Sequence, residues 1–237
     1  MHNSVTGYAI PNCQAVEDPR PANWGLRSLS PHWKLLATIL GLVCALPAFP
    51  QQPGKAGQFD YYLLVLSWSP EFCHSKPGNA QCKDHRGFVL HGFWPQYNNG
   101  GYPVGCTTTQ PAPTDLSKIK QIMPPEIVTH EWQKHGTCSG LSGDAYFRLA
   151  ESVLESVKIP ADLIAPTRTA TFRPSALKKD FESTNPALAD PDIAIQLHQG
   201  YLNAVELCFS KGEHPAPTAC LHIQDVNGGT FRVPPVR

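Results

Sequence analysis

The sequence lacks three features that would place a protein quickly in a class. It has no excess charge of either sign, since 19 Lys and Arg residues balance 19 Asp and Glu residues. The basic footprint usual in nucleic-acid binders is therefore missing from the totals. Its apolar run at residues 35–49 is too short to span a bilayer comfortably. No segment repeats, and no domain boundary is evident after residue 55, so we expect one domain.

The first 50 residues have the layout of a leader with a signal peptide. Arg27 and Lys34 precede the apolar run at 35–49, with no acidic residue between them and the run. Cleavage near Ala45 or Ala48 would leave a domain at 51–237. We therefore expect a periplasmic or secreted protein whose mature form has no membrane anchor.

Two histidine-bearing segments carry the chemistry of the chain. The first is His91-Gly92-Phe93-Trp94-Pro95-Gln96, and the second is His130-Glu131-Trp132-Gln133-Lys134-His135-Gly136-Thr137-Cys138. At about 100° per residue on a helix, four side chains of the second segment fall within roughly 140° of arc: His130, Glu131, Lys134 and His135. Trp132 then points to the opposite side as a core residue, and Gly136 ends the helix. With His91 from another element, these groups suit proton transfer around an anionic reaction centre.

A zinc site is the obvious competing interpretation. The zinc-protease helix carries His-Glu-x-x-His, with its histidines four residues apart. Here His130 and His135 are five apart, and the ammonium group of Lys134 between them would repel a cation. We therefore expect neither a metal nor another cofactor. A surface helix with mixed charges is the plainer alternative, but five titratable groups in two aromatic-rich segments disfavour it.

At this point the sequence resembles the ribonuclease T2 family of transferase-type endoribonucleases. The family's first active-site segment is matched by residues 91–95, and its second by residues 130–138 without a gap. The stretches at 66–73 and 202–208 are similar to an early and a late core strand of the family. The resemblance covers roughly residues 58–226. It implies a ribonuclease T2-like catalytic domain at 51–237, a single α+β domain with a mainly antiparallel β-sheet flanked by helices.

The resemblance also implies an activity and a role for each site residue. Single-stranded RNA would be cut by its own 2′-OH, giving a 2′,3′-cyclic phosphate and then a 3′-phosphate. By analogy with the family, His135 is the base and His91 the acid. Lys134 and protonated His130 hold the phosphate, and Glu131 orients this cluster. RNA is then the partner of a monomer that has no obligate protein partner.

Base recognition is the part in which this chain departs from the family. Ile127 and Val128 stand where members often carry Phe and Trp, and Gln96 stands where some carry a base-reading Asp or Asn. Trp94 and Gln96 remain the expected substrate-binding residues, although Trp94 could equally be a core residue. A protein of another class, which binds RNA or signals without catalysis, is disfavoured by the complete set of five motif residues.

The cysteine count supports export. Of the 8 cysteines, Cys13 and Cys44 lie in the leader, and six remain: Cys73, Cys82, Cys106, Cys138, Cys208 and Cys220. Six cysteines allow fifteen pairings, and an even set in an exported chain predicts disulfides. The family resemblance implies Cys73–Cys82, Cys106–Cys138 and Cys208–Cys220. The second link would tie the end of the catalytic helix to the loop beyond His91.

Histidines make the charge sensitive to pH. Of the 19 basic and 19 acidic residues, 16 and 17 lie from Gln51 onward, together with 8 of the 10 histidines. Protonating these eight would change the net charge from −1 to +7, because histidine titrates near pH ~6.5. Binding to RNA phosphates should therefore strengthen toward acid pH.

Hydrophobic periodicity predicts the remaining elements. We expect strands at 59–68, 86–93, 193–197, 202–209 and 221–226, and a turn at 98–101. Helices are expected at 114–123, where Thr114 or Asp115 can cap, at 144–158, at 174–183, and after Pro125 through the second motif. His91 would then lie near the end of its strand.

Overall fold

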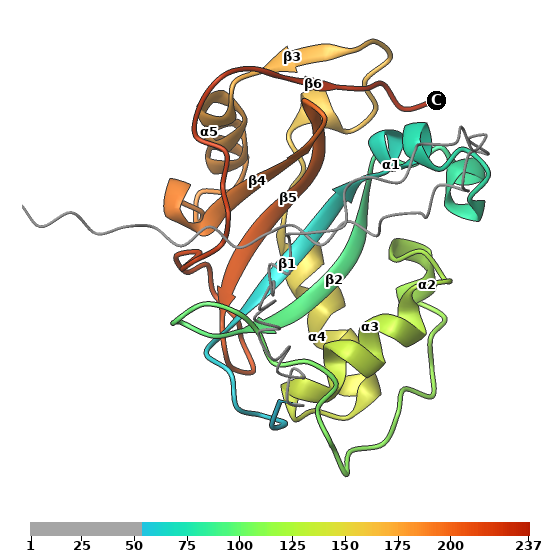
Figure 1. The fold of residues 1–237 in the computed structure, drawn as a ribbon, viewed down its shortest axis with the longest axis vertical. Coiled ribbons are helices and arrows are strands. Elements are labelled where there is room, and N and C mark those ends of the chain that lie inside the picture. Colours follow the sequence, from blue (N-terminus) through green and yellow to red (C-terminus); the bar gives the residue numbers. More distant parts are fainter. Residues whose placement is uncertain (1–53) are drawn as a thin grey trace, which may run out of the picture. The chain divides into compact units, whose positions relative to one another are not determined.

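The computed structural model describes residues 54–237 and has the predicted α+β architecture (Figure 1). The leader predicted at 1–50 lies outside the described residues. None of the helices within 54–237 is long and apolar enough to cross a membrane.

An antiparallel sheet forms the centre of the fold. Its strands are β2 (Phe88–Gln96), β1 (Tyr61–Trp68), β5 (Tyr201–Ser210) and β4 (Ile193–His198), each antiparallel to its neighbour. Two strands of three residues each extend it: β6 (Phe231–Val233) pairs with the start of β5, and β3 (Ala170–Phe172) pairs with β6. The apolar side chains of β1 are covered on both faces of the sheet, because successive residues of a strand point to opposite sides.

Helices cover one face of this sheet and form the main core. The helices that contribute to this core are α2 (Ile119–Ile122), α3 (Val128–Lys134), α4 (Gly143–Ser156) and α5 (Pro174–Thr184), with the 3₁₀ turn η3 (Ala161–Leu163). Helix α1 (Ser69–Ser75) follows β1, and the other 3₁₀ turns are η1 (Ala80–Asp84), η2 (Gly136–Ser139) and η4 (Asp190–Asp192). The core joins side chains of β1 and β2 to large aromatic residues of the helices: Leu64, Leu66, Phe93, Trp132, Tyr146 and Phe181. Burying each such side chain contributes on the order of 1.5–3 kcal/mol, and Trp132 has the core position predicted for it.

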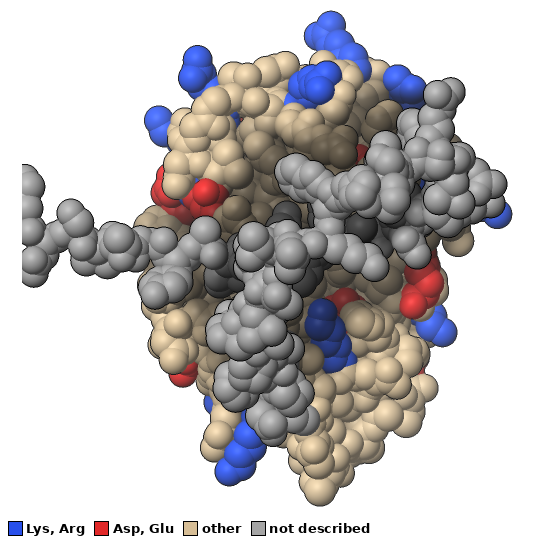
Figure 2. All heavy atoms as spheres, viewed as in Figure 1, with Lys and Arg blue, Asp and Glu red and all other residues tan. Residues whose placement is uncertain are grey.

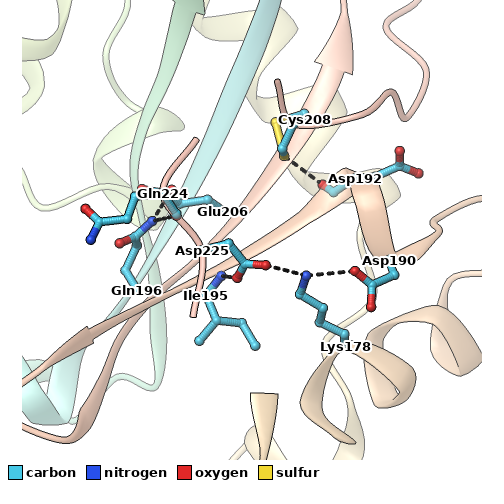
Figure 3. A network of polar contacts seen from close by, with 10 residues as sticks. Lys178, Asp190, Asp192, Ile195, Gln196, Glu206, Cys208, Gln224 and Asp225 are labelled. Carbon is cyan, nitrogen blue, oxygen red and sulfur yellow. Dashed lines mark hydrogen bonds and ion pairs between the residues drawn. A yellow bond between two sulfur atoms is a disulfide. The ribbon is translucent and has the colours of Figure 1, made fainter. Parts of the chain in front are cut away.

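The opposite face carries a smaller cluster around Leu63 and Val65, against which Ile223 of an irregular segment, residues 220–226, packs. Figure 3 shows how polar contacts fix this segment. Asp225 accepts hydrogen bonds from Lys178 Nζ at 2.6 Å and from the Ile195 amide at 2.9 Å. The Cys208–Cys220 disulfide holds the first residue of this segment. The strand predicted at 221–226 is therefore wrong, because side-chain contacts and the disulfide, and not a strand ladder, hold this segment.

Other differences from the predicted elements have local causes. The helix expected at 114–123 is reduced to α2, because Asp144 accepts hydrogen bonds from the backbone of both Thr114 and Asp115 and holds them outside a helix. Helix α1 and the two three-residue strands were not predicted. Strand β2 runs on to Gln96, since it is an edge strand, where Pro95 is tolerated. His91 therefore lies in the middle of β2 and not near its end.

Candidate active site

A β-bulge in β2 positions His91. Gly92 pairs with Val65 and Leu90 pairs with Leu66, so His91 is the extra residue between two ladder partners. A bulge of this kind re-aims a side chain out of the regular alternation. The imidazole Nδ1 of His91 lies 3.0 Å from the Ser67 hydroxyl of the neighbouring strand. The side chain remains 43% exposed, so the ring is fixed at one nitrogen and open to solvent at the other.

Glu131 of α3 lies at the centre of the site, only 1% exposed. Its Oε2 accepts a hydrogen bond of 2.6 Å from the Trp94 indole, and its Oε1 is 3.8 Å from His91 Nε2. Gly92 makes room for this arrangement, because a Cβ there would lie 1.8 Å from Trp94 Nε1 and 2.6 Å from Glu131 Oε2. The glycine of the first motif is thus required by the contact between the two motifs.

His135 follows α3 directly and is buried, with 2% of its surface exposed. Its ring stacks on Trp94, with centroids 4.8 Å apart and planes 20° apart, and Tyr102 lies 5.6 Å away. Its Nδ1 is buried and has no hydrogen-bond partner among the described residues. Trp94 also meets His91 edge-on at 5.4 Å, so one indole contacts both histidines and Glu131.

Burial and positive charge shift the pKa values of these groups in a consistent way. Burial, with smaller contributions from the charges of Lys134, His130 and His91, lowers the pKa of His135 to about 3. The pKa of His91 is lowered by burial and by the charges of His130 and Lys134. Burial raises the pKa of Glu131 to about 7, although the Trp94 hydrogen bond and Lys134 oppose this. The positive charges thus surround a carboxyl that is protonated, and so uncharged, in mildly acidic solution. Such an environment suits a bound anion.

This local concentration contrasts with the rest of the surface. On the face seen in Figure 2, the visible Lys and Arg side chains are scattered among Asp and Glu. No basic stripe appears on the visible part of that face. Within residues 54–237, no group of three or more His, Cys, Asp or Glu side chains is placed to hold a metal ion.

A disulfide fixes the end of α3 to the loop beyond β2. Cys106 and Cys138 are bonded, and the Gly105 amide donates to the Lys134 carbonyl at 2.8 Å. The other two disulfides are Cys73–Cys82 and Cys208–Cys220, so all three predicted pairs are confirmed. Helix α3 ends at Lys134 and η2 begins at Gly136, so the helix ends just before this glycine, as predicted. Gly136 itself is not left-handed. Gly140 has φ of 79°, whereas a Cβ at Gly136 would lie 2.4 Å from Trp132.

The structure brings together His91, Trp94, Glu131, Lys134 and His135, and His130 acts on them through its charge. Gln96 is 4% exposed at the end of β2. Ile127 and Val128 pack in or against the main core and offer no exposed platform for a base.

Two residues of the site were missed from the sequence: Ser67, which contacts His91, and Tyr102, which lies 5.9 Å below Lys134 Nζ. Ser67 could have been found from the sequence, because it lies in the early stretch that resembles the family. No feature of the sequence pointed to Tyr102.

The site thus gathers imidazole rings, an ammonium group and a buried carboxyl, and comparisons with known proteins show the family of the chain. The model of the ribonuclease T2 family matches residues 59–220. A ribonuclease of Aeromonas hydrophila is 42% identical over 146 residues, which are 60% of this chain and 67% of that protein. The RNase-related protein from Calystegia sepium has the same fold at 20% identity, with a TM-score of 0.58 over 79% of this chain and 100% of that one. RNase NT in complex with 5′-AMP matches with a TM-score of 0.57 at 24% identity, over 75% of this chain and 98% of that one.

The chain belongs to the ribonuclease T2 family. The family resemblance read from the two motifs is thereby confirmed, and so is the enzyme class, an endoribonuclease of the T2 type.

Proposed function

We propose that this enzyme cuts single-stranded RNA by attack of the 2′-OH on the neighbouring phosphodiester. The products are a 2′,3′-cyclic phosphate and then a 3′-phosphate. One observation carries the proposal: the rings of His91 and His135 both contact Trp94, whose indole binds the buried Glu131, and Lys134 lies beside them. Because the substrate supplies its own nucleophile, the reaction needs no metal and no cofactor.

His135 is the proposed base. Its lowered pKa keeps the ring neutral, so that a lone pair is free to accept the 2′-OH proton. Since Nδ1 is buried, Nε2 is the accepting nitrogen. A bound phosphate would raise the pKa of His135 toward the working range, because a nearby anion favours the imidazolium. That imidazolium is stabilised by stacking on Trp94.

His91 is the proposed acid, which protonates the departing 5′-oxygen through Nε2. Ser67 holds Nδ1, and a hydroxyl serves both forms of the ring, as donor to the neutral one and acceptor from the charged one. Lys134 and His130 stabilise negative charge on the phosphate oxygens. Glu131, which carries a proton below about pH 7, orients this cluster and is itself held by Trp94.

Trp94 and Gln96 are the proposed substrate-binding residues. They are two positions apart on β2 and so face the same side of the sheet. Tyr102, 37% exposed beside Lys134, adds an aromatic face on which a base can stack. The amide of Gln96 would then contact the edge of a base near this aromatic pair.

We also propose that the enzyme is exported. Three disulfides within 54–237 require an oxidising compartment, such as the periplasm or the outside of the cell. Residues 1–50 would be the leader with its signal peptide, and 51–237 the catalytic domain of a monomer without an obligate protein partner.

Product analysis tests the chemistry. Single-stranded RNA, its 2′-O-methyl analogue and DNA are incubated with the enzyme in excess chelator, and the ends are read by mass spectrometry. We expect cyclic phosphate ends from RNA only, at an undiminished rate. Cleavage of DNA, or a loss of activity that added metal restores, would contradict the mechanism.

Histidine variants test the assignment of roles. His91→Ala and His135→Ala should each lower kcat by roughly 10²- to 10⁴-fold, the usual scale for a lost acid or base. His214→Ala, at an exposed position in the turn after β5, is the matched control and should keep the wild-type rate. A folded His91→Ala or His135→Ala variant with a near-normal rate would show that the assignment is wrong.

A further inference from the structure

A cavity of about 500 Å³ lies at the end of β1 and contains none of the proposed catalytic residues. Its walls come from α1, η1, the start of β5 and the last residues of the chain. This volume is within the range of small-molecule and nucleotide sites. The cavity is therefore large enough for one nucleotide unit, and the proposed chemistry does not use it.

The cavity is close to His91 along the sheet. Ser67 contacts His91, and Ser69, two residues further, lines the cavity. Two strand residues span about 7 Å. On the neighbouring strand, Ala204 pairs with Ser67, and Tyr201 of the cavity wall is three residues away. An RNA strand bound at His91 can thus reach the cavity with a nearby nucleotide.

Two rings face each other across the cavity. The centroids of His74 and Tyr201 are 6.3 Å apart, with the planes tilted by 39°. A flat base can stack between two rings when those rings are about 7 Å apart, which is twice the usual contact distance. The guanidinium of Arg232 lies 4.0 Å from the Tyr201 centroid and backs that ring, whereas His74 is exposed on α1 and has room to turn. A small rotation of His74 would therefore open a slot of the right width.

A buried carboxyl lines the same cavity. Glu71 is 5% exposed, and one of its oxygens contacts His198 Nδ1 at 2.6 Å. A carboxylate accepts hydrogen bonds, so it can pair with both the N1–H and the exocyclic amino group of guanine, whereas adenine and cytosine offer one amino group on that edge and uracil offers one N3–H. Proline faces, from Pro70, Pro77, Pro234 and Pro235, supply apolar walls.

We propose that this cavity is a subsite for a nucleobase of the same RNA strand, beyond the two nucleotides that flank the cut bond. His74 and Tyr201 hold the base between them, and Glu71 favours guanine, which offers two adjacent donors. This inference rests on the proposed function, since it takes RNA as the ligand. The subsite contributes to binding of long substrates and not to the chemical step.

Substrate length provides the test. Tyr201→Ala and His74→Ala should raise KM for an oligonucleotide by roughly tenfold, the scale of one lost stack on an aromatic ring. Both should leave kcat/KM on dinucleoside phosphates within about twofold of wild type, which also shows that the variants fold. Tyr201→Phe should behave as wild type, and His214→Ala is the control for an exposed histidine. An equal loss on short and long substrates, or no loss on either, would overturn the subsite.

Binding without cleavage separates this proposal from the proposed function. Uncleavable 2′-O-methyl oligonucleotides that differ at one base are titrated by fluorescence anisotropy. We expect guanine to bind more tightly than adenine, cytosine or uracil at one position, and Glu71→Gln to reduce this preference. An enzyme that cuts no RNA but shows this pattern would refute the proposed function alone. Absence of the pattern in an active enzyme would refute the subsite alone.

Discussion

Gly92→Ala should disable the site through a single methyl group. The new Cβ would lie 1.8 Å from Trp94 Nε1 and 2.6 Å from Glu131 Oε2, whereas ordinary contact needs about 3.5 Å. The indole must move, and its 2.6 Å hydrogen bond to Glu131 is lost. A hydrogen bond to an ionisable group is worth about 1.5–3 kcal/mol. If the site depends on this bond, kcat/KM falls roughly 10- to 100-fold.

The assay is kcat/KM on a dinucleoside phosphate, together with the melting temperature. Trp94→Phe removes the same donor without a clash and should lower kcat/KM by a similar factor. It should also raise the pKa of Glu131 further, because the Trp94 bond now lowers it. Gly228→Ala is the control, since a Cβ there meets nothing within 4 Å. A Gly92→Ala enzyme within twofold of the wild-type rate would refute the reasoning.

Four further predictions test other contacts. Ser67→Ala removes an acceptor from protonated His91, so the alkaline limb of the pH profile for kcat/KM should move to lower pH; an unmoved limb would exclude this role. Lys134→Ala should cost about 2–4 kcal/mol in kcat/KM, with the fold checked by circular dichroism. Glu206 has a pKa raised by burial to about 7, so its favourable contribution is complete below its unfolded pKa and is lost as pH rises through 7. Glu206→Gln should therefore raise the melting temperature at pH 8 relative to pH 5, and an equal effect at both would contradict this. Thiol counting on denatured, unreduced mature enzyme should find no free cysteine, and two or more would contradict the three disulfides.

The α+β fold class was predicted from the sequence and is confirmed, whereas the roles of the site residues stay predictions. The helical arc of the second motif predicted that Glu131, Lys134 and His135 share one face. In the structure Glu131 and Lys134 lie on α3, and His135 follows its last residue. The disulfide pairs followed from family resemblance, since six cysteines alone leave fifteen pairings open.

What the sequence did not reveal depends on contacts between distant segments. The bulge at His91 arises from the register against β1, and a strand pattern read alone does not contain it. Residues 221–226 were predicted as a strand, yet contacts with α5 and β4 hold them in an irregular form. Lys178 binds the Asp225 carboxylate, and Gln196 donates to the Gln224 carbonyl. The role of Gly92 became visible only when Trp94 and Glu131 were seen in contact.

If the enzyme is exported as proposed, we expect the disulfide at the end of α3 to set when it becomes active. Helix α3 has only seven residues, and a helix that short has little stability of its own. Its carboxyl end is held by Cys106–Cys138, a link that closes a loop of 32 residues and is worth about 3–4 kcal/mol. His130, Lys134 and His135 thus depend on a covalent bond that forms only under oxidising conditions. A newly made chain in a reducing compartment would have an unfinished site, so the RNA of the cell that makes it would be spared until the enzyme had left.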